Sequence, residues 1–255
     1  MKKKKKTKYF IVAVALVLVI TGTISAYLKE SDSIYNLFTI GRAKVSIDEG
    51  EFEQEQIISP TETIDKAPTV KNDGSIEEYV FAVVSMPMKE ISVFDDVTKK
   101  PDYDPNTNIT KLQSVFEVGV KAPHTEETVS ETVGSETVNY DYFKYNTTEE
   151  NGGKWVFLKT TDTAANGSNP AYKNFLFGYS AAIKPDTNTG TIFDNVTLRN
   201  FIEENIEGNT SVEIKVGAFC IQCDNLDTHS YAKTGLDAEK LKDIYTICVN
   251  KGLTS

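Results

Sequence analysis

The sequence predicts an all-β protein, a jelly-roll-like β-sandwich with a polar insertion and one C-terminal α-helix. This prediction rests on short runs that are rich in β-branched and aromatic residues and are separated by turn residues. Few stretches of the sequence show a helical period. The runs are Phe38–Ile47, Tyr79–Met86, Trp155–Thr160, Tyr172–Ile183, Thr191–Leu198 and Val212–Ile221. Turns with positive φ angles are expected at Asn72-Asp73-Gly74, Asn151-Gly152-Gly153, Asn166-Gly167 and Asn188-Thr189-Gly190.

Composition and charge exclude several classes of protein and partner. The 255 residues are 40% hydrophobic and 25% charged, which excludes collagen, a low-complexity linker and a polytopic membrane protein. The formal net charge is −10, and six of the 27 basic side chains are lysines within residues 1–26, which contain no acidic residue. The rest of the chain is therefore even more acidic, and neither nucleic acid nor an anionic membrane is an expected partner.

The N-terminus has the pattern of an export signal. The lysines of Lys2–Lys8 precede the apolar run Phe10–Ile20, and Thr21-Gly22-Thr23 follows it. We expect cleavage between Ala26 and Tyr27, so that residues 1–26 are a signal peptide. The alternative is an uncleaved anchor, which the short apolar run and the Thr/Gly break disfavour. No second hydrophobic stretch and no LPxTG motif follows, so the product is expected outside the cell, free of the membrane after cleavage.

Two segments depart from the strand pattern of the domain expected over residues 37–255. Residues 123–150 form a polar insertion, within which 123–138 is expected to be a solvated loop or a polar hairpin. The other segment is a helix at about 237–250, with Asp237 as its N-cap and Gly252 beyond its end. Its apolar positions follow the helical spacing and are Leu241, Ile244, Tyr245 and Cys248.

The strand before this helix indicates where the helix packs. One face of Val212–Cys223 is apolar throughout and belongs to the core; it carries Val212, Ile214, Val216, Ala218 and Cys220. The opposite face begins polar and becomes apolar at Phe219 and Ile221, with Cys223 next in line. We expect the terminal helix to cover that half. If a disulfide forms, it should join Cys223 to Cys248, because Cys220 points to the core.

No set of residues predicts an enzyme, a cofactor or a metal centre. The two histidines, His124 and His229, lie outside any H-E-x-x-H motif, and we expect both to be solvated and non-catalytic. No G-x-S-x-G, Walker A or G-x-G-x-x-G motif is present. A Cys3His zinc site from the three cysteines and His229 is disfavoured, because Cys220 and Cys223 point to opposite strand faces and exported cysteines tend to be oxidised.

One acidic loop resembles a calcium site only in part. Asp102, Asp104, Asn106 and Asn108 are spaced as in an EF-hand, but Thr107 replaces the glycine and Gln113 the closing glutamate. The EF-hand interpretation therefore fails, and we expect a solvated loop there, with a looser cation site as the alternative.

Five segments resemble the bacterial exported proteins that are processed by a SipW-type signal peptidase, the family of the biofilm fibre protein TasA and of camelysin. Three lie in the first third of the chain, and the other two are looser similarities. The segments are Thr21–Leu28, Asn36–Gly41, Lys66–Gly74 followed by Tyr79–Phe81, Phe193–Leu198 and Ala218–Leu226.

This resemblance implies a secreted sandwich protein that is found on the cell surface or in the extracellular matrix of a Gram-positive bacterium. Family members assemble into matrix fibres, so the implied partners are other copies of the chain, the SipW-type peptidase and other matrix components. The metalloprotease activity attached to camelysin has no support in this sequence, which lacks recognisable zinc ligands. A monomeric adhesin or binding module and a secreted hydrolase remain the alternatives.

Residues 27–36 form an arm between the cleavage site and the first strand. The segment Tyr27–Tyr35 is apolar at its ends, at Tyr27, Leu28, Ile34 and Tyr35, and polar between them. After cleavage it can add to the sheet edge of another subunit through backbone hydrogen bonds. A frayed N-terminus without a role is the equal alternative.

Overall fold

Two five-stranded sheets face each other in the part of the chain that the structure describes. The structure is a computed structural model that describes residues 42–50, 58–93, 111–167, 170–201, 212–224, 226 and 231–253. All of them belong to one unit, Gly41–Ser255. The predicted all-β sandwich with one C-terminal helix is confirmed.

The first sheet has the strand order β12-β4-β10-β9, with β5 pairing to the far end of β4. Its strands are β4 (Glu78–Ile91), β5 (Lys111–Ser114), β9 (Trp155–Thr163), β10 (Ala171–Tyr179) and β12 (Lys215–Gln222). All of their pairings are antiparallel. Its central strand, β4, is long and almost entirely buried.

The second sheet has the order β2-β11-β6-β8-β7. Its strands are β2 (Thr63–Asp65), β6 (Phe116–Gly119), β7 (Glu126–Val133), β8 (Glu136–Asn146) and β11 (Asn195–Leu198). One pairing, between β6 and β8, is parallel. A separate pair of strands, β1 (Val45–Asp48) and β3 (Thr69–Asn72), completes the β-structure of the described residues.

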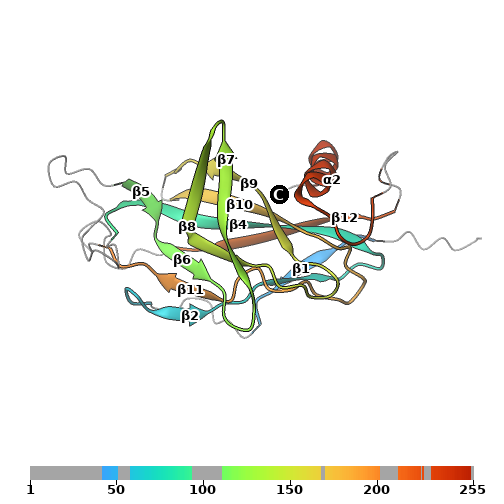
Figure 1. Ribbon diagram of the computed structural model, residues 1–255, viewed down its shortest axis with the longest axis horizontal. Helices are drawn as coiled ribbons and strands as arrows, with labels where there is room; N and C mark the ends of the chain where they lie inside the picture. Colours follow the sequence, from blue (N-terminus) through green and yellow to red (C-terminus); the bar gives the residue numbers. More distant parts are fainter. Residues whose placement is uncertain are drawn as a thin grey trace, which may run out of the picture. The chain divides into compact units, whose positions relative to one another are not determined.

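The main core lies between the two large sheets (Figure 1). Alternate residues of each strand point into it, as the period of a β-strand requires. The first sheet contributes Val80, Ala82, Val84, Met86, Phe175 and Phe177, and the second contributes Val118, Val129, Phe143 and Val196. The rings of Phe143 and Phe175 meet across the interface with their centroids 4.4 Å apart.

The predicted strands exist, but their ends differ from the expectation. The run Phe38–Ile47 gives only β1 within the described residues, because its first part lies outside them. The run Thr191–Leu198 begins as a strand only at Asn195, since the side chains of Thr191 and Asp194 hydrogen bond to each other in the loop before it. Within the run Tyr172–Ile183, the strand ends at Tyr179.

The polar segment forms a hairpin, one of the two forms that the sequence allows. Strands β7 and β8 are joined by a two-residue turn in which Gly134 has a φ of +65°. Most of β7 is exposed, but β8 carries three aromatic residues of the main core, which are Tyr140, Phe143 and Tyr145. The hairpin therefore belongs to the second sheet.

The predicted helix is α2 (Ala238–Asn250), and its caps are those expected. The carboxylate of Asp237 accepts the backbone N–H of Lys240 at 2.9 Å. At the other end Gly252 has a φ of +67°, and the N–H groups of Gly252 and Leu253 bond back to the carbonyls of Val249 and Cys248. This pattern is the Schellman motif, which satisfies the last carbonyls of the helix.

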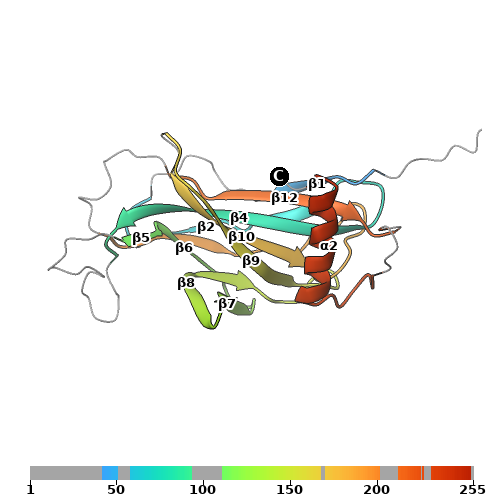
Figure 2. The ribbon, with the colours of Figure 1, turned by 90° about the horizontal axis from the view of Figure 1, so that it is seen from above.

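The helix runs across the strands of the first sheet, on the face opposite to the main core (Figure 2). It buries Leu241, Ile244 and Cys248 against residues of the sheet. We call this second apolar group the helix cluster; it contains Tyr79, Phe81, Leu158, Leu176, Phe219, Ile221, Cys223, Leu241, Ile244 and Cys248. The predicted division of the two faces of Val212–Cys223 is confirmed.

Glycines in the predicted turns have two different physical roles. Gly152 and Gly167 have the positive φ angles that the sequence predicts. Gly74 and Gly190 do not. A Cβ atom on Gly74 would collide with Glu78 and with the carbonyl of Arg42, and one on Gly190 would make a tight contact with Glu150. The expectation of positive φ is wrong at these two positions, because the close approach of a side chain, and not the backbone conformation, favours glycine there.

Candidate functional site: the open edge of β12 and the polar clamp of the hairpin

Strand β12 is one of the two edge strands of the first sheet, and β9 is the other. Strand β12 pairs with β4 along its length, and no described strand pairs with its other side. Strand β1 lies beside it but is hydrogen bonded to β3 (Figures 1 and 2). Unpaired N–H and C=O groups along such a strand are a template for a further strand.

The side chains that β12 and its approach point toward the main core are only partly buried. This set comprises Val212, Ile214, Val216, Ala218 and Cys220. Their neighbours on β4, Val80, Ala82 and Val84, have no exposed surface at all. Among the described residues the sandwich is therefore incompletely covered at this edge, and apolar side chains of an added strand would complete it.

A buried carboxylate lies at the end of this edge. Glu78 pairs with Gln222 of β12, and its Oε1 atom accepts the backbone N–H of Lys44 at 2.8 Å. Its Oε2 atom is buried and has no hydrogen-bond partner among the described residues. Burial raises the pKa of Glu78, and the Glu78 carboxylate in turn contributes to the raised pKa of the neighbouring Cys220 thiol, whose main cause is burial.

The segment Lys66–Gly74 shapes the backbone around this carboxylate. Asn72 is fully buried; its Nδ2 atom donates to the carbonyls of Ile76 and Ile183, and its Oδ1 atom accepts the N–H of Gly74. At the other end Lys66 is buried and forms an ion pair of 2.5 Å with Glu49. These polar residues have structural roles, because each satisfies a group that folding removes from water.

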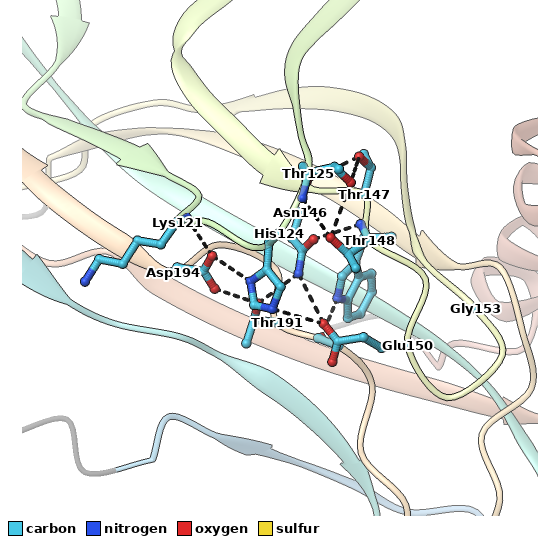
Figure 3. Close-up of polar contacts among 12 residues, drawn as sticks. Lys121, His124, Thr125, Asn146, Thr147, Thr148, Glu150, Gly153, Thr191 and Asp194 are labelled. Atoms are coloured by element: carbon cyan, nitrogen blue, oxygen red, sulfur yellow. Dashed lines mark hydrogen bonds and ion pairs between the residues drawn. The ribbon is translucent and has the colours of Figure 1, made fainter.

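His124 lies between two carboxylates at the base of the hairpin (Figure 3). Its Nδ1 atom is 2.8 Å from Oδ2 of Asp194, and its Nε2 atom is 3.4 Å from Oε1 of Glu150. Asp194 also accepts the N–H of Lys121 and the hydroxyl of Thr191, both at 2.8 Å. His124 is solvated only in part, with 27% of its side chain exposed, because the fold brings Asp194 to it from a distant part of the sequence.

A second set of hydrogen bonds, from Asn146, closes this group, which we call the polar clamp. Asn146 is buried; its Nδ2 atom donates to Thr191 at 3.1 Å and to Glu150 at 3.5 Å, and its Oδ1 atom accepts the N–H of Thr148. The clamp thus joins both ends of the hairpin to the loop before β11. Its members are Lys121, His124, Asn146, Thr148, Glu150, Thr191 and Asp194.

The clamp contains a histidine that a carboxylate orients, an arrangement also found in acid–base catalysis. A histidine oriented by a carboxylate activates a nucleophile when its other nitrogen faces a hydroxyl or thiol. Here the other nitrogen faces the carboxylate of Glu150. Across the described ranges, no group of three or more His, Cys, Asp or Glu side chains is arranged to hold a metal ion. The geometry therefore supports a structural role, in which the clamp holds the base of the hairpin against the loop before β11.

The three cysteines are free thiols in the structure. Cys223 and Cys248 share the helix cluster, and Cys220 contacts the main core. The two faces are those that the sequence predicts, and the disulfide between Cys223 and Cys248 stays a prediction. Burial raises the pKa of Cys223 and of Cys248 to about 12.

Several predicted sites lie outside the described residues. These are the cleavage site at Ala26 and Tyr27, the arm Tyr27–Tyr35, the residue His229 and the acidic positions of the loop 102–108. In the portion that the structure does describe, no helix is long and apolar enough to cross a membrane.

Sequence reasoning missed the clamp and the buried Glu78. The only signal for the clamp was the segment Phe193–Leu198, which contains Asp194 but does not indicate its partner. Glu78 stood directly before a predicted strand, where a charged residue is ordinarily exposed.

The fold and the open edge define an all-β sandwich protein. Comparisons with known protein families, with curated proteins and with solved structures find no match to this chain. The resemblance to the SipW-processed proteins therefore rests on the sequence segments alone.

Proposed function

We propose that this chain is a secreted structural protein of a bacterial cell surface or extracellular matrix, and that it assembles into fibres by strand addition. In this proposal a SipW-type signal peptidase releases the arm Tyr27–Tyr35, and the arm of one subunit pairs with the β12 edge of the next. The incompletely covered apolar face of β12 is the observation that carries the proposal.

The physical chemistry of the edge supports this mode of assembly. An added strand gains backbone hydrogen bonds along β12, and its alternate side chains bury the exposed parts of Val216, Ala218 and Cys220. The arm is apolar at both ends, so it can place side chains at two separate points. Before cleavage the arm is held at the membrane, so that processing would be the switch for assembly.

The first test removes the donor. Residues 27–255 are expected to elongate into filaments, whereas residues 36–255 are expected to fold but remain monomeric. Light scattering and electron microscopy measure assembly, and thermal unfolding confirms that both proteins are folded. If folded 36–255 forms filaments as readily as 27–255, the arm is not the donor.

The second test blocks the acceptor. Ala218→Lys places an inward charge on the edge strand, a substitution of the kind that protects natural edges from pairing. We expect the variant to be folded and unable to elongate, while Val133→Lys, at an exposed position of the hairpin, elongates normally. Mixing Ala218→Lys in 27–255 with unmodified 36–255 pairs one donor with one acceptor, so it should give a dimer and no filament.

A further inference from the structure

A groove lies on the outer face of the first sheet, beside the part that α2 covers. Its volume is about 360 Å³, within the ~300–1,000 Å³ of small-molecule sites. The helix crosses the sheet toward one end of the strands (Figure 2), and Tyr245 of the helix lines the groove. The polar part of the lining comes from β4, β9, β10 and β12 and consists of Ser85, Lys159, Thr161, Thr163, Asn174 and Lys215.

The charge of the groove is opposite to that of the chain. Two lysines line it and no acidic residue does, although the net charge is −10. The Nζ atom of Lys159 lies 4.5 Å from the ring centre of Tyr245, and that of Lys215 lies 4.8 Å from the ring centre of Tyr172. Aromatic faces hold both ammonium groups without neutralising them. Lys215 also forms an ion pair with the exposed Glu213, which is long at 3.9 Å.

The groove also offers unused hydrogen-bonding groups. Asn174 donates through Nδ2 to the hydroxyl oxygens of Thr161 and Thr163, at 3.4 and 2.9 Å. These bonds use neither the amide oxygen of Asn174 nor the hydroxyl protons of the two threonines. Ser85 forms no side-chain hydrogen bond with any described residue. A ligand with many hydroxyl groups can bond to all of these atoms.

We propose that this groove binds an acidic oligosaccharide, a short run of sugar residues that carry carboxylates. The lysines would pair with carboxylates, and the amide and hydroxyl side chains would form hydrogen bonds with sugar hydroxyls. An acidic peptide fits less well, because β4 and β10 are paired on both sides and present no backbone groups here. This inference does not depend on assembly, because one subunit forms the whole groove.

The test measures binding of the purified full chain to tetragalacturonate by calorimetry. Neutral maltotetraose and tetraglutamate serve as the comparison ligands. We expect tetragalacturonate to bind more tightly than both, and its affinity to fall as salt is added. Equal binding of maltotetraose would show that charge is not recognised, and equal binding of tetraglutamate would show a site for acidic peptides; either result overturns the proposal, as does no binding of tetragalacturonate.

Matched variants locate the site. The double variant Lys159→Gln/Lys215→Gln is expected to weaken tetragalacturonate binding about 10-fold. Lys154→Gln/Lys184→Gln removes the same charge at positions outside the groove and should leave the affinity unchanged. Thr161→Val keeps the shape and removes a hydroxyl, so a loss of about 3-fold is expected. If the two double variants lose affinity equally, the attraction is only general charge and the groove is not the site.

Discussion

The Nδ1 atom of His124 lies 2.8 Å from Oδ2 of Asp194, a residue 70 positions later in the chain. This contact joins the segment that leads into the β7–β8 hairpin to the loop that leads into β11. Most of β7 is exposed and contributes little burial of its own. We infer that the polar clamp supplies part of what holds the base of the hairpin in the second sheet.

Asp194→Ala is expected to lower the free energy of unfolding by about 2 kcal/mol, because partly buried donors lose a charged acceptor. His124→Ala removes one of these contacts and should cost about 1 kcal/mol. Urea denaturation measures both values. The control is Asp141→Ala, which removes an exposed carboxylate of β8 and should cost less than about 0.5 kcal/mol. An Asp194→Ala variant as stable as this control would mean that the clamp does not fasten the hairpin.

Glu78→Gln is expected to raise the melting temperature at pH 8. The pKa of Glu78 is higher in the folded protein than in the unfolded chain. Above the unfolded-state pKa of Glu78 the unfolded state ionises more readily than the folded one, so the folded protein loses stability as the pH rises. Glutamine keeps an acceptor for the N–H of Lys44 without a charge. The advantage should shrink toward pH 3, where Glu78 is protonated in both states.

The control for this pH dependence is Glu136→Gln, at an exposed position of the hairpin. It should change the melting temperature little at either pH. A Glu78→Gln variant that is less stable than the wild type at pH 8 would show that the charge of Glu78 has a favourable partner.

Leu241→Ala should destabilise the protein by about 3 kcal/mol, the typical cost of a cavity at a fully buried leucine. The side chain lies against Gly178 of β10, where a Cβ atom would come within 3.1 Å of Cδ2 of Leu241. Val249→Ala, on the exposed side of the same helix, should cost less than about 1 kcal/mol. Thermal unfolding of the two variants separates docking of α2 from helix propensity, and equal losses would contradict the docking.

The cysteines should resist alkylation at pH 8 as long as the protein is folded. The thiolate is the reactive form, and burial keeps the pKa of Cys223 and Cys248 at about 12. We expect iodoacetamide to modify all three cysteines quickly in urea and slowly in buffer, as mass spectrometry can measure. Rapid labelling in buffer would mean that the helix cluster opens easily.

If the secreted protein is oxidised, peptide mapping without reduction should find Cys223 joined to Cys248. The two thiols share one apolar cluster, and Cys220 packs on the opposite face of β12. A linkage between Cys220 and Cys248 would contradict this assignment of faces. Cys220→Ser should leave the disulfide intact and provides the matched control.

The terminal helix shows how far sequence reasoning extends. Its apolar spacing, its N-cap Asp237 and the glycine beyond its end all act within a few residues of one another, and each is present in the structure. The same holds for the alternating faces of Val212–Cys223. Period and capping are local properties, so they can be derived before the fold is known.

The sequence was less informative about the ends of the strands and about the shorter strands. Strand β11 begins four residues later than predicted, because Thr191 and Asp194 are engaged in the clamp. The short strands β2, β3, β5 and β6 had no distinct signal. Their pairing depends on partners elsewhere in the chain, as in β2 with β11.

The sequence by itself determined the β character of this protein, the terminal helix with both caps, and the face of each residue on the last strand. Only the tertiary structure decided that His124 meets Asp194, that Glu78 is buried, and that Lys159 and Lys215 line one groove. The physical reason is that periodicity and capping act between near neighbours. Polar partners and charged grooves instead arise where strands that are distant in sequence lie side by side.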